Sequence, residues 1–311
     1  MTDKKDLRIV FMGTPDFAVA SLDILIQHGY HVVGVVTAPD KPAGRGLQLQ
    51  ESAVKKYAVS KGLKVLQPEK LKNPAFQEEL RSLNATLQVV VAFRMLPITV
   101  WDMPPLGTIN VHASLLPNYR GAAPINWAVI NGEKQTGVTT FRLQHEIDTG
   151  NILFSDTVEI REDETAGELH DVLMQKGAGV LLKTVDALCN DTLEGTPQAH
   201  LDPDTLKHAP KLFKENCRID WQQPMDHIYN LIRGLSPYPT AWTQLHGKSV
   251  KIFKATKDHT APKEAPGTVV SDQKTFLKMA AADGYIQLEE LQLEGKKRMD
   301  IVAFLRGYRF E

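Results

Sequence analysis

Residues 8–18 read Arg-Ile-Val-Phe-Met-Gly-Thr-Pro-Asp-Phe-Ala, and this stretch decides the predicted fold. Its first five residues form an apolar run typical of a buried strand. The Gly-Thr-Pro that follows predicts a turn, with Thr14 as the N-cap of a helix and Pro15 as the first helical residue. An apolar stripe over 18–26 continues that helix, and Val-Val-Gly-Val-Val at 32–36 is the next strand. The chain therefore opens with a β-α-β unit.

The same alternation continues over the first 190 residues. Further strands are expected near 64–67, 87–92, 107–113 and 137–143, and helices near 52–59, 74–83 and 123–131. Unbroken apolar runs, such as Val-Val-Val-Ala at 89–92, are typical of strands buried on both faces, as in parallel sheets. We predict an α/β fold over 1–190, with a doubly wound, mostly parallel open sheet of the Rossmann-like kind.

The remainder of the chain has a different pattern. Residues 191–210 are rich in Asp, Pro and Thr, which predicts an interdomain linker. A helical stretch around 228–232 follows, and then come short strand signals at 241–245, 249–255, 267–271, 274–280 and 285–290. These features predict a small, OB-like β-barrel over 211–311. The predicted domains are thus 1–190, a linker at 191–210, and 211–311.

The composition is that of a soluble globular protein, with 311 residues, 42% apolar and 23% charged. No uncharged stretch is long enough to span a bilayer, and the apolar run before Gly13 is too short for a signal peptide. Cys189 and Cys217 are the two cysteines, which argues against a disulfide scaffold and a Cys-rich metal site. We expect a cytoplasmic protein without a membrane partner and without a metal.

The formal charge of −1 is unevenly distributed along the chain. Residues 205–311 hold 17 Lys and Arg against 12 Asp and Glu, whereas the rest of the chain holds 19 against 25. This asymmetry favours a polyanion partner for the C-terminal part, although a solvated lysine-rich surface would give the same pattern. Lys296, Lys297 and Arg298 are the local candidates for phosphate contacts, with a solvated turn as the alternative.

The candidate catalytic residues are Asn110, His112 and Asp148. Asn110 and His112 are two apart on a predicted strand, so both side chains project from one face. Buried polar groups of this kind are costly unless they are paired or meet a substrate. An amide donor, a titratable imidazole and a carboxylate suit acyl transfer to an amine, because the first two can stabilise an oxyanion and the carboxylate can orient the imidazole. His145 and Glu146 are rival acid-base groups in the same segment as Asp148.

Two other segments suggest ligand contacts. The turn at Gly13 lacks the later glycines of a dinucleotide motif, so a plain strand-to-helix turn is favoured over a nicotinamide site with Asp40 on the ribose. Lys-Pro-Ala-Gly-Arg-Gly at 41–46 predicts an exposed loop beyond the C-terminal end of a strand, where open α/β sheets bind ligands. Arg45 can pair with a phosphate or stack on a base there, and an inert surface loop is the alternative.

Together these motifs resemble the 10-formyltetrahydrofolate-dependent formyltransferase superfamily. The matching stretches are 11–18, 38–46, 110–125, 144–150, 218–221 and 237–242, so the resemblance covers nearly the whole chain. The match over 110–125 is specific to the superfamily. The Pro-Ala-Gly-Arg loop and the basic C-terminal barrel favour the members that formylate methionine on charged initiator tRNA, for translation initiation.

The resemblance implies a role for each candidate residue. Asn110, His112 and Asp148 would be catalytic, with 10-formyltetrahydrofolate as co-substrate and no metal. The folate would contact the 90–96 loop and the segment after His112, through Phe93, Leu96, Ser114, Leu115, Leu116 and Pro117. Lys41 and Arg45 would contact the acceptor end of the tRNA, and the barrel would bind the outside of the tRNA in a monomeric enzyme.

The 93–97 segment departs from the family pattern, and two other functions are considered for the chain. At 93–97 the chain reads Phe-Arg-Met-Leu-Pro, so Arg94 stands where the family has a glycine and the loop is shorter. This difference affects the expected contacts with the pterin ring. A formyltransferase acting on a small amine, such as an amino sugar nucleotide or glycinamide ribonucleotide, is the first alternative. A folate- or RNA-binding protein without catalytic activity is the second.

Overall fold

The computed structural model describes residues 4, 6–43, 48–146, 148–198 and 205–308. The chain forms two compact units: unit 1 comprises Met1–Arg120, Gly137–Val158 and Asp171–Lys207, and unit 2 comprises Gly121–Thr136, Glu159–His170 and His208–Glu311. Two internal segments thus pack with the C-terminal part, which a single linker at 191–210 does not anticipate. The domain limits 1–190, 191–210 and 211–311 stay a prediction.

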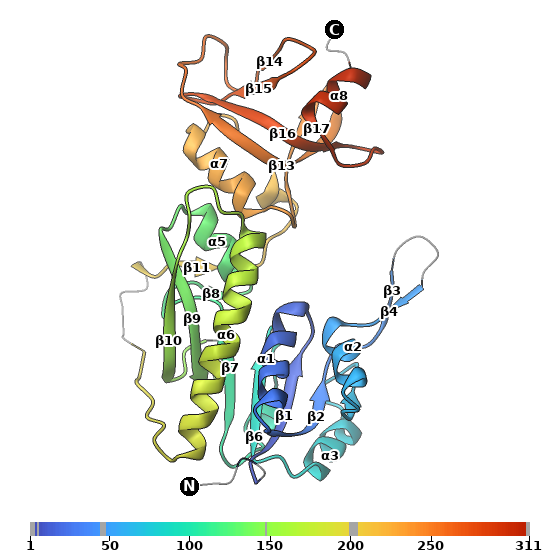
Figure 1. The fold of residues 1–311 in the computed structure, drawn as a ribbon, viewed down its shortest axis with the longest axis vertical. Helices are drawn as coiled ribbons and strands as arrows, with labels where there is room; N and C mark the ends of the chain where they lie inside the picture. Colours follow the sequence, from blue (N-terminus) through green and yellow to red (C-terminus); the bar gives the residue numbers. More distant parts are fainter. Residues whose placement is uncertain (1–3, 5, 44–47, 147, 199–204, 309–311) are drawn as a thin grey trace. The chain divides into compact units, whose positions relative to one another are not determined.

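Unit 1 is built on a seven-stranded open sheet (Figure 1). Its strands in spatial order are β10 (Ile152–Glu159), β9 (Gln135–Arg142), β7 (Thr108–His112), β6 (Leu87–Val91), β1 (Arg8–Gly13), β2 (His31–Val36) and β5 (Val65–Leu66). The pairs β7–β6, β6–β1, β1–β2 and β2–β5 are parallel, and β7–β9 is antiparallel. The predicted doubly wound, mostly parallel sheet is confirmed.

Helices cover the sheet of unit 1. They are α1 (Asp16–Gln27), α2 (Ala53–Ser60), α3 (Pro74–Ser82), the short α4 (Ile98–Trp101) and the long α6 (Ala166–Cys189), whose first five residues belong to unit 2. Side chains at Ser52 and Asn73 cap α2 and α3 by accepting backbone N–H groups, which stabilises each helix by roughly 1 kcal/mol. The sequence did not predict β10 or α6. Helix α6 packs on β7 and β9, because Gly177 lies against Val111 and Val138.

The turn between β1 and α1 depends on Gly13. A Cβ at this position would lie 2.6 Å from the Cβ of Ala18 and 3.0 Å from the carbonyl oxygen of Val91. The glycine therefore lets α1 approach the ends of β1 and β6 closely. Helix α1 begins at Asp16 with Pro15 as its N-cap and no side-chain cap, so the prediction of Thr14 as the N-cap was wrong.

The segment predicted as an exposed loop at 41–46 begins instead as a strand. β3 (Lys41–Ala43) pairs antiparallel with β4 (Gln48–Gln50) in a separate hairpin, with Lys41 opposite Gln50. Strand β4 lies only two residues before α2, and β3 follows soon after β2. The hairpin thus projects from the C-terminal side of β2, where the sequence predicted a ligand-contacting segment.

Unit 2 contains a curled, six-stranded antiparallel sheet, which confirms the predicted C-terminal β fold. The strands are β12 (Ala241–Leu245), β13 (Lys248–Asp258), β14 (Val269–Ser271), β15 (Leu277–Ala280), β16 (Tyr285–Leu293) and β17 (Met299–Asp300). The helices are α5 (Pro124–Ile130), α7 (Met225–Gly234), α8 (Ile301–Gly307) and the 3₁₀ turn η2 (Glu215–Cys217). Two short strands, β8 (Arg120–Gly121) and β11 (His208–Ala209), form a further small sheet.

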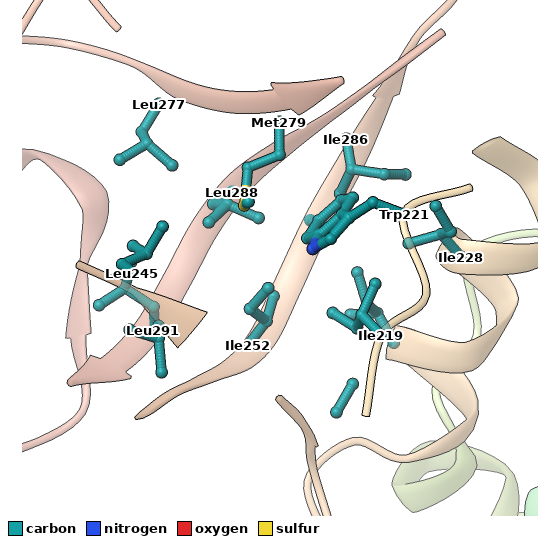
Figure 2. Packing of buried hydrophobic residues seen from close by; sticks show 14 of the residues in the cluster. Ile219, Trp221, Ile228, Leu245, Ile252, Leu277, Met279, Ile286, Leu288 and Leu291 are labelled. Carbon is teal, nitrogen blue, oxygen red and sulfur yellow. The ribbon is translucent and has the colours of Figure 1, made fainter. Parts of the chain in front are cut away.

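The core of unit 2 is assembled around Trp221 (Figure 2). Its indole lies among Ile219, Ile228, Ile252 and Ile286, which come from the segment before α7, from α7 itself and from the sheet. The indole N–H donates to the Thr243 hydroxyl at 2.9 Å, so it is paired although its surroundings are apolar. The core thus contains a large aromatic side chain whose polar atom is satisfied.

Among the described helices, none combines the length and apolarity that crossing a membrane would require.

Candidate active site

Asn110 and His112 project from the same face of β7, as the sequence predicted. Asn110 lies between Val90 of β6 and Phe141 of β9, in the middle of three paired strands. His112, at the C-terminal end of β7, is 8% exposed, whereas Asn110 is half-buried. The Asn110 amide forms no hydrogen bond with any other described residue. It is therefore a donor held at a fixed position on a rigid strand.

The ring of His112 has its two nitrogens in different settings. Nε2 lies 2.8 Å from the carbonyl oxygen of Tyr119, and a carbonyl can only accept, so Nε2 carries a hydrogen and donates it. Nδ1 faces the Asp148 carboxylate, with Oδ2 at 4.0 Å. This separation allows a charge interaction but is too long for a hydrogen bond. The arrangement leaves Nδ1 as the nitrogen that can exchange a proton.

Asp148 is held in an unusual backbone conformation. Its φ of +55° is in the left-handed region, which costs a non-glycine residue on the order of 1 kcal/mol. Two residues later, a Cβ on Gly150 would lie 1.6 Å from the Arg142 carbonyl oxygen, so only glycine fits there. Strain of this kind persists when the surroundings fix it, and it is common at functional sites.

The segment after His112 forms a turn that is stabilised by its own hydrogen bonds and by Thr139 of β9. The Ser114 hydroxyl donates to the Asn118 carbonyl oxygen at 2.7 Å. Thr139, which pairs with His112 across β7 and β9, donates to the Ser114 carbonyl oxygen at 2.7 Å and accepts from the Leu116 N–H at 3.2 Å. The Ser114 hydroxyl is thus bonded inside the turn and the Leu116 N–H to Thr139 of β9, while Leu115 and Pro117 are half-buried. The predicted folate contacts of these four residues stay a prediction.

A cavity of 570 Å³ opens beside the 93–97 segment. It is lined by Thr14, Ala38, Pro39, Asp40, Lys41, Glu69, Ala92, Phe93 and Arg94, from the C-terminal ends of β1, β2 and β6. Phe93 thus lies at a ligand-sized space, whereas the side chain of Leu96 is buried in the core of unit 1. Parallel α/β sheets bind ligands at this edge.

Arg94, the residue that departs from the family pattern, ties two segments of the cavity wall together. Its guanidinium donates to the carbonyl oxygen of Pro68 and to that of Glu69, the latter at 2.8 Å. Burial lowers the pKa of this guanidinium, and its Nε has no hydrogen-bond partner among the described residues. The larger residue thus connects the 93–97 segment to the chain after β5.

The hairpin β3–β4 is anchored at both ends by one lysine. The Lys55 ammonium on α2 pairs with the carboxylate of Asp40, just before β3, and with that of Glu51, just after β4, at 2.9 Å. Asp40 also accepts from Gln67 at 2.8 Å. The Asp40 carboxylate is therefore occupied, which argues against the ribose contact considered for it. Lys55 holds the pKa of Asp40 below its ordinary value. Arg45 lies outside the described residues.

The rival acid-base groups have other surroundings. The His145 ring meets the Trp101 ring edge to face, with centroids 5.7 Å apart. Glu146 is exposed, and its carbonyl oxygen accepts from the Thr149 hydroxyl at 3.1 Å. Neither side chain forms a hydrogen bond or an ion pair with His112 or Asn110 in the described part of the chain, so Asp148 is the acid that the structure brings to His112.

The predicted cationic cluster at 296–298 lies in the turn after β16. Lys296 and Lys297 are exposed, but Arg298 forms an ion pair with Glu290 at 2.5 Å and its guanidinium lies 4.4 Å from the Phe253 ring centroid. One of the three predicted cations is therefore largely neutralised.

A second cationic cluster in unit 2 was missed by the sequence analysis. Lys214 and Arg218 lie over the Trp242 ring, at 5.3 and 5.7 Å from its centroid, and Lys211 lies 5.6 Å from the centroid of Phe213, a ring that is 57% exposed. None of the three cations has an ion pair with a described residue. Aromatic rings interleaved with unpaired cations are typical of nucleic-acid contacts.

The described residues include no group of three or more His, Cys, Asp or Glu side chains arranged to hold a metal ion.

Comparison with known families and proteins gives matches along the whole chain. Residues 7–185 match the formyl transferase family model, and residues 211–309 match the formyl transferase C-terminal domain. The methionyl-tRNA formyltransferase of Parabacteroides distasonis is 56% identical over 314 residues, which cover 98% of this chain and 97% of the relative. The methionyl-tRNA formyltransferase of Flavobacterium johnsoniae is 53% identical, with the same two coverages.

Solved structures of lower identity share the fold. An N-formyltransferase from Helicobacter canadensis, in complex with folinic acid and dTDP-3-aminofucose, is 20% identical with a TM-score of 0.69, covering 94% of this chain and 99% of the other. HypX from Aquifex aeolicus, in complex with tetrahydrofolic acid, is 18% identical with a TM-score of 0.66, covering 96% of this chain and 46% of the other.

Proposed function

Since the chain belongs to the formyl transferase family in both its N-terminal and its C-terminal parts, we propose that it formylates the α-amine of methionine on charged initiator tRNA, with 10-formyltetrahydrofolate as the formyl donor. The acceptor follows from relatives that are 47–56% identical over nearly the whole chain. The observation that carries the chemistry is the pairing of His112 with Asp148 beside the Asn110 amide. We propose that the enzyme is cytoplasmic and acts as a monomer.

The residues present fit a formyl donor. The donor molecule supplies the formyl group and the nitrogen that leaves. Asn110 can donate its amide N–H to the formyl oxygen as that oxygen gains negative charge, and a donor of this kind contributes about 3–4 kcal/mol to the transition state. His112 can donate to the same oxygen when Nδ1 is protonated. Asp148 faces Nδ1 and can pass a proton from the attacking amine, by way of the imidazole, to the nitrogen that leaves.

The acceptor is tested by comparing substrates. The purified enzyme is given 10-formyltetrahydrofolate with charged initiator tRNA, with glycinamide ribonucleotide, or with a nucleotide-linked amino sugar, and kcat/KM is measured for each. We expect charged tRNA to exceed both small amines by orders of magnitude. Preference for a small amine would instead support the alternative acceptor, and ligand binding without transfer would contradict the proposed enzyme.

The hairpin β3–β4 would meet the acceptor end of the tRNA through Lys41 and Arg45. Lys55 sets the start and end of this hairpin by pairing with Asp40 and Glu51. Lys55→Met leaves both carboxylates without their shared cation, so the residues that border the hairpin are no longer held together. We expect kcat/KM for charged tRNA to fall about tenfold, which corresponds to roughly 1.4 kcal/mol, while the KM for the folate changes less than about twofold.

Lys56→Met is the matched control for this experiment, because Lys56 is exposed on the same helix and the charge change is the same. It should leave both constants near those of the unmodified enzyme. Equal losses in Lys55→Met and Lys56→Met would mean that helix charge, and not the hairpin, is responsible.

Unit 2 would bind the tRNA through phosphates, and we assign this contact to Lys211, Lys214 and Arg218 in addition to the predicted cluster 296–298. The triple Ala variant of the first cluster should bind tRNA more weakly and with a flatter salt dependence, by about 0.9 in the log–log slope for each phosphate that it no longer neutralises. Equilibrium binding at several salt concentrations measures this slope. The triple Ala variant at 296–298 is the comparison, and a flattened slope in that variant alone would place the contact there.

A further inference from the structure

The chain after α6 returns along the first residues of β10. Thr196 and Ile152 form an isolated antiparallel bridge, in which each N–H donates to the other residue's carbonyl oxygen at 2.8 Å. Antiparallel register then places Gln198, two residues after Thr196, opposite Gly150, two residues before Ile152. A segment that the sequence marks as a linker thus reaches the loop that carries Asp148.

The Gln198 side chain is fully engaged at this loop. It is 8% exposed, and its amide nitrogen donates to the carbonyl oxygens of Asp148 at 2.7 Å and of Gly150 at 2.9 Å. Its amide oxygen accepts from Nη2 of Arg120 at 2.6 Å and from Nε at 3.2 Å. Both hydrogens and both lone pairs of this amide are therefore used, and one of the two carbonyls that it holds belongs to Asp148, the residue with the positive φ.

These hydrogen bonds connect His112 with the backbone of Asp148 through Tyr119, Arg120 and Gln198. Tyr119, whose carbonyl oxygen accepts from His112 Nε2, is the residue before Arg120. Arg120 holds Gln198, and Gln198 holds the backbone of Asp148, whose carboxylate faces His112 Nδ1. The imidazole of His112 and the backbone of Asp148 are thus both held by one connected series of residues.

We propose that Gln198 is a positioning residue for formyl transfer, which sets the distance and direction of Asp148 toward His112. This inference rests on the proposed function. Asp148 has a φ of +55°, and a loop in that conformation relaxes when its restraints are removed. All the hydrogen bonds of the Gln198 amide are made to other protein groups. Its replacement should therefore change the geometry of the His112–Asp148 pair without removing an interaction with either substrate.

The first test compares two substitutions at this position. Gln198→Leu removes all four hydrogen bonds, whereas Gln198→Glu keeps an acceptor for Arg120 and lacks the N–H groups that hold the loop. We expect kcat to fall about tenfold in both, because displacements near 1 Å can cost up to a hundredfold, with KM for tRNA and folate changed less than about twofold. Gln175→Leu, at an exposed position of α6, is the matched control and should behave as the unmodified enzyme.

The second test asks whether Gln198 acts through Asp148. In an Asp148→Asn background, adding Gln198→Leu should lower kcat by less than about twofold, since the group that it positions is already disabled. A further tenfold loss in the double variant would overturn the inference, as would an unchanged kcat in Gln198→Glu. Thermal melting of each variant separates these results from unfolding. Absence of transfer by the unmodified enzyme would instead overturn the proposed function.

Discussion

His112→Ala lowers kcat for formyl transfer by about a hundredfold or more, if the imidazole assists both the oxyanion and the proton transfer. The side chain acts mainly in the transition state, so the Kd for the folate should change little. Initial rates with charged initiator tRNA and equilibrium folate binding measure the two quantities separately. Asp148→Asn should give a loss of the same order, because its amide cannot balance an imidazolium.

The matched control is His145→Ala, which removes an exposed imidazole from the same part of unit 1. His145 contacts the Trp101 ring and has no hydrogen bond or ion pair with Asn110, His112 or Asp148 among the described residues. Its replacement should leave kcat within about threefold of the unmodified value, which corresponds to less than about 0.7 kcal/mol in the activation free energy. A large loss in His145→Ala with a normal rate in His112→Ala would transfer the acid-base role to His145.

Asn110→Ala lowers kcat by about 10²- to 10³-fold, which is the measured range for loss of one oxyanion donor. Asn110 is well placed for this function, because β7 is paired on both sides and fixes the amide between Val90 and Phe141. The effect should be equal across the pH range in which the enzyme is stable, since an amide does not titrate. Single-turnover rates at several pH values test this.

Asn110→Asp separates the donor role from side-chain volume. The two side chains have nearly the same size, but an ionised carboxylate has no N–H and repels a developing oxyanion. The Asp variant should therefore be no faster than the Ala variant. A rate near that of the unmodified enzyme would exclude Asn110 as the oxyanion donor.

Much of this architecture follows from local sequence signals. The strand at 8–12, its turn at Gly13 and the apolar run at 89–92 predicted a parallel sheet, because strands buried on both faces have no polar alternation. Period-two alternation also placed Asn110 and His112 on one face, and the structure has them on β7 as expected. Apolar runs and period-two alternation are each contained in one continuous segment, so the sequence shows them directly.

Interactions between distant segments could not be predicted in this way. Gln198 donates to the main-chain carbonyl of Asp148, and His112 donates to that of Tyr119. Because every residue has a main-chain carbonyl, the residue types at 119 and 148 do not indicate these hydrogen bonds. The ion pair of Arg298 with Glu290 depends on the register of β16 and β17. The β3–β4 hairpin was predicted as a loop because glycine and proline at 42–46 suggest a turn more strongly than a strand.

The most direct test of the proposed reaction follows an isotopic label in the formyl group. Charged initiator tRNA is incubated with 10-formyltetrahydrofolate carrying a ¹³C formyl carbon, and the aminoacyl end is examined by mass spectrometry. We expect labelled formyl-methionine with the unmodified enzyme and almost none with His112→Ala or Asp148→Asn in the same time. Unlabelled methionine with the unmodified enzyme, or equal labelling by the three proteins, would contradict the proposed reaction.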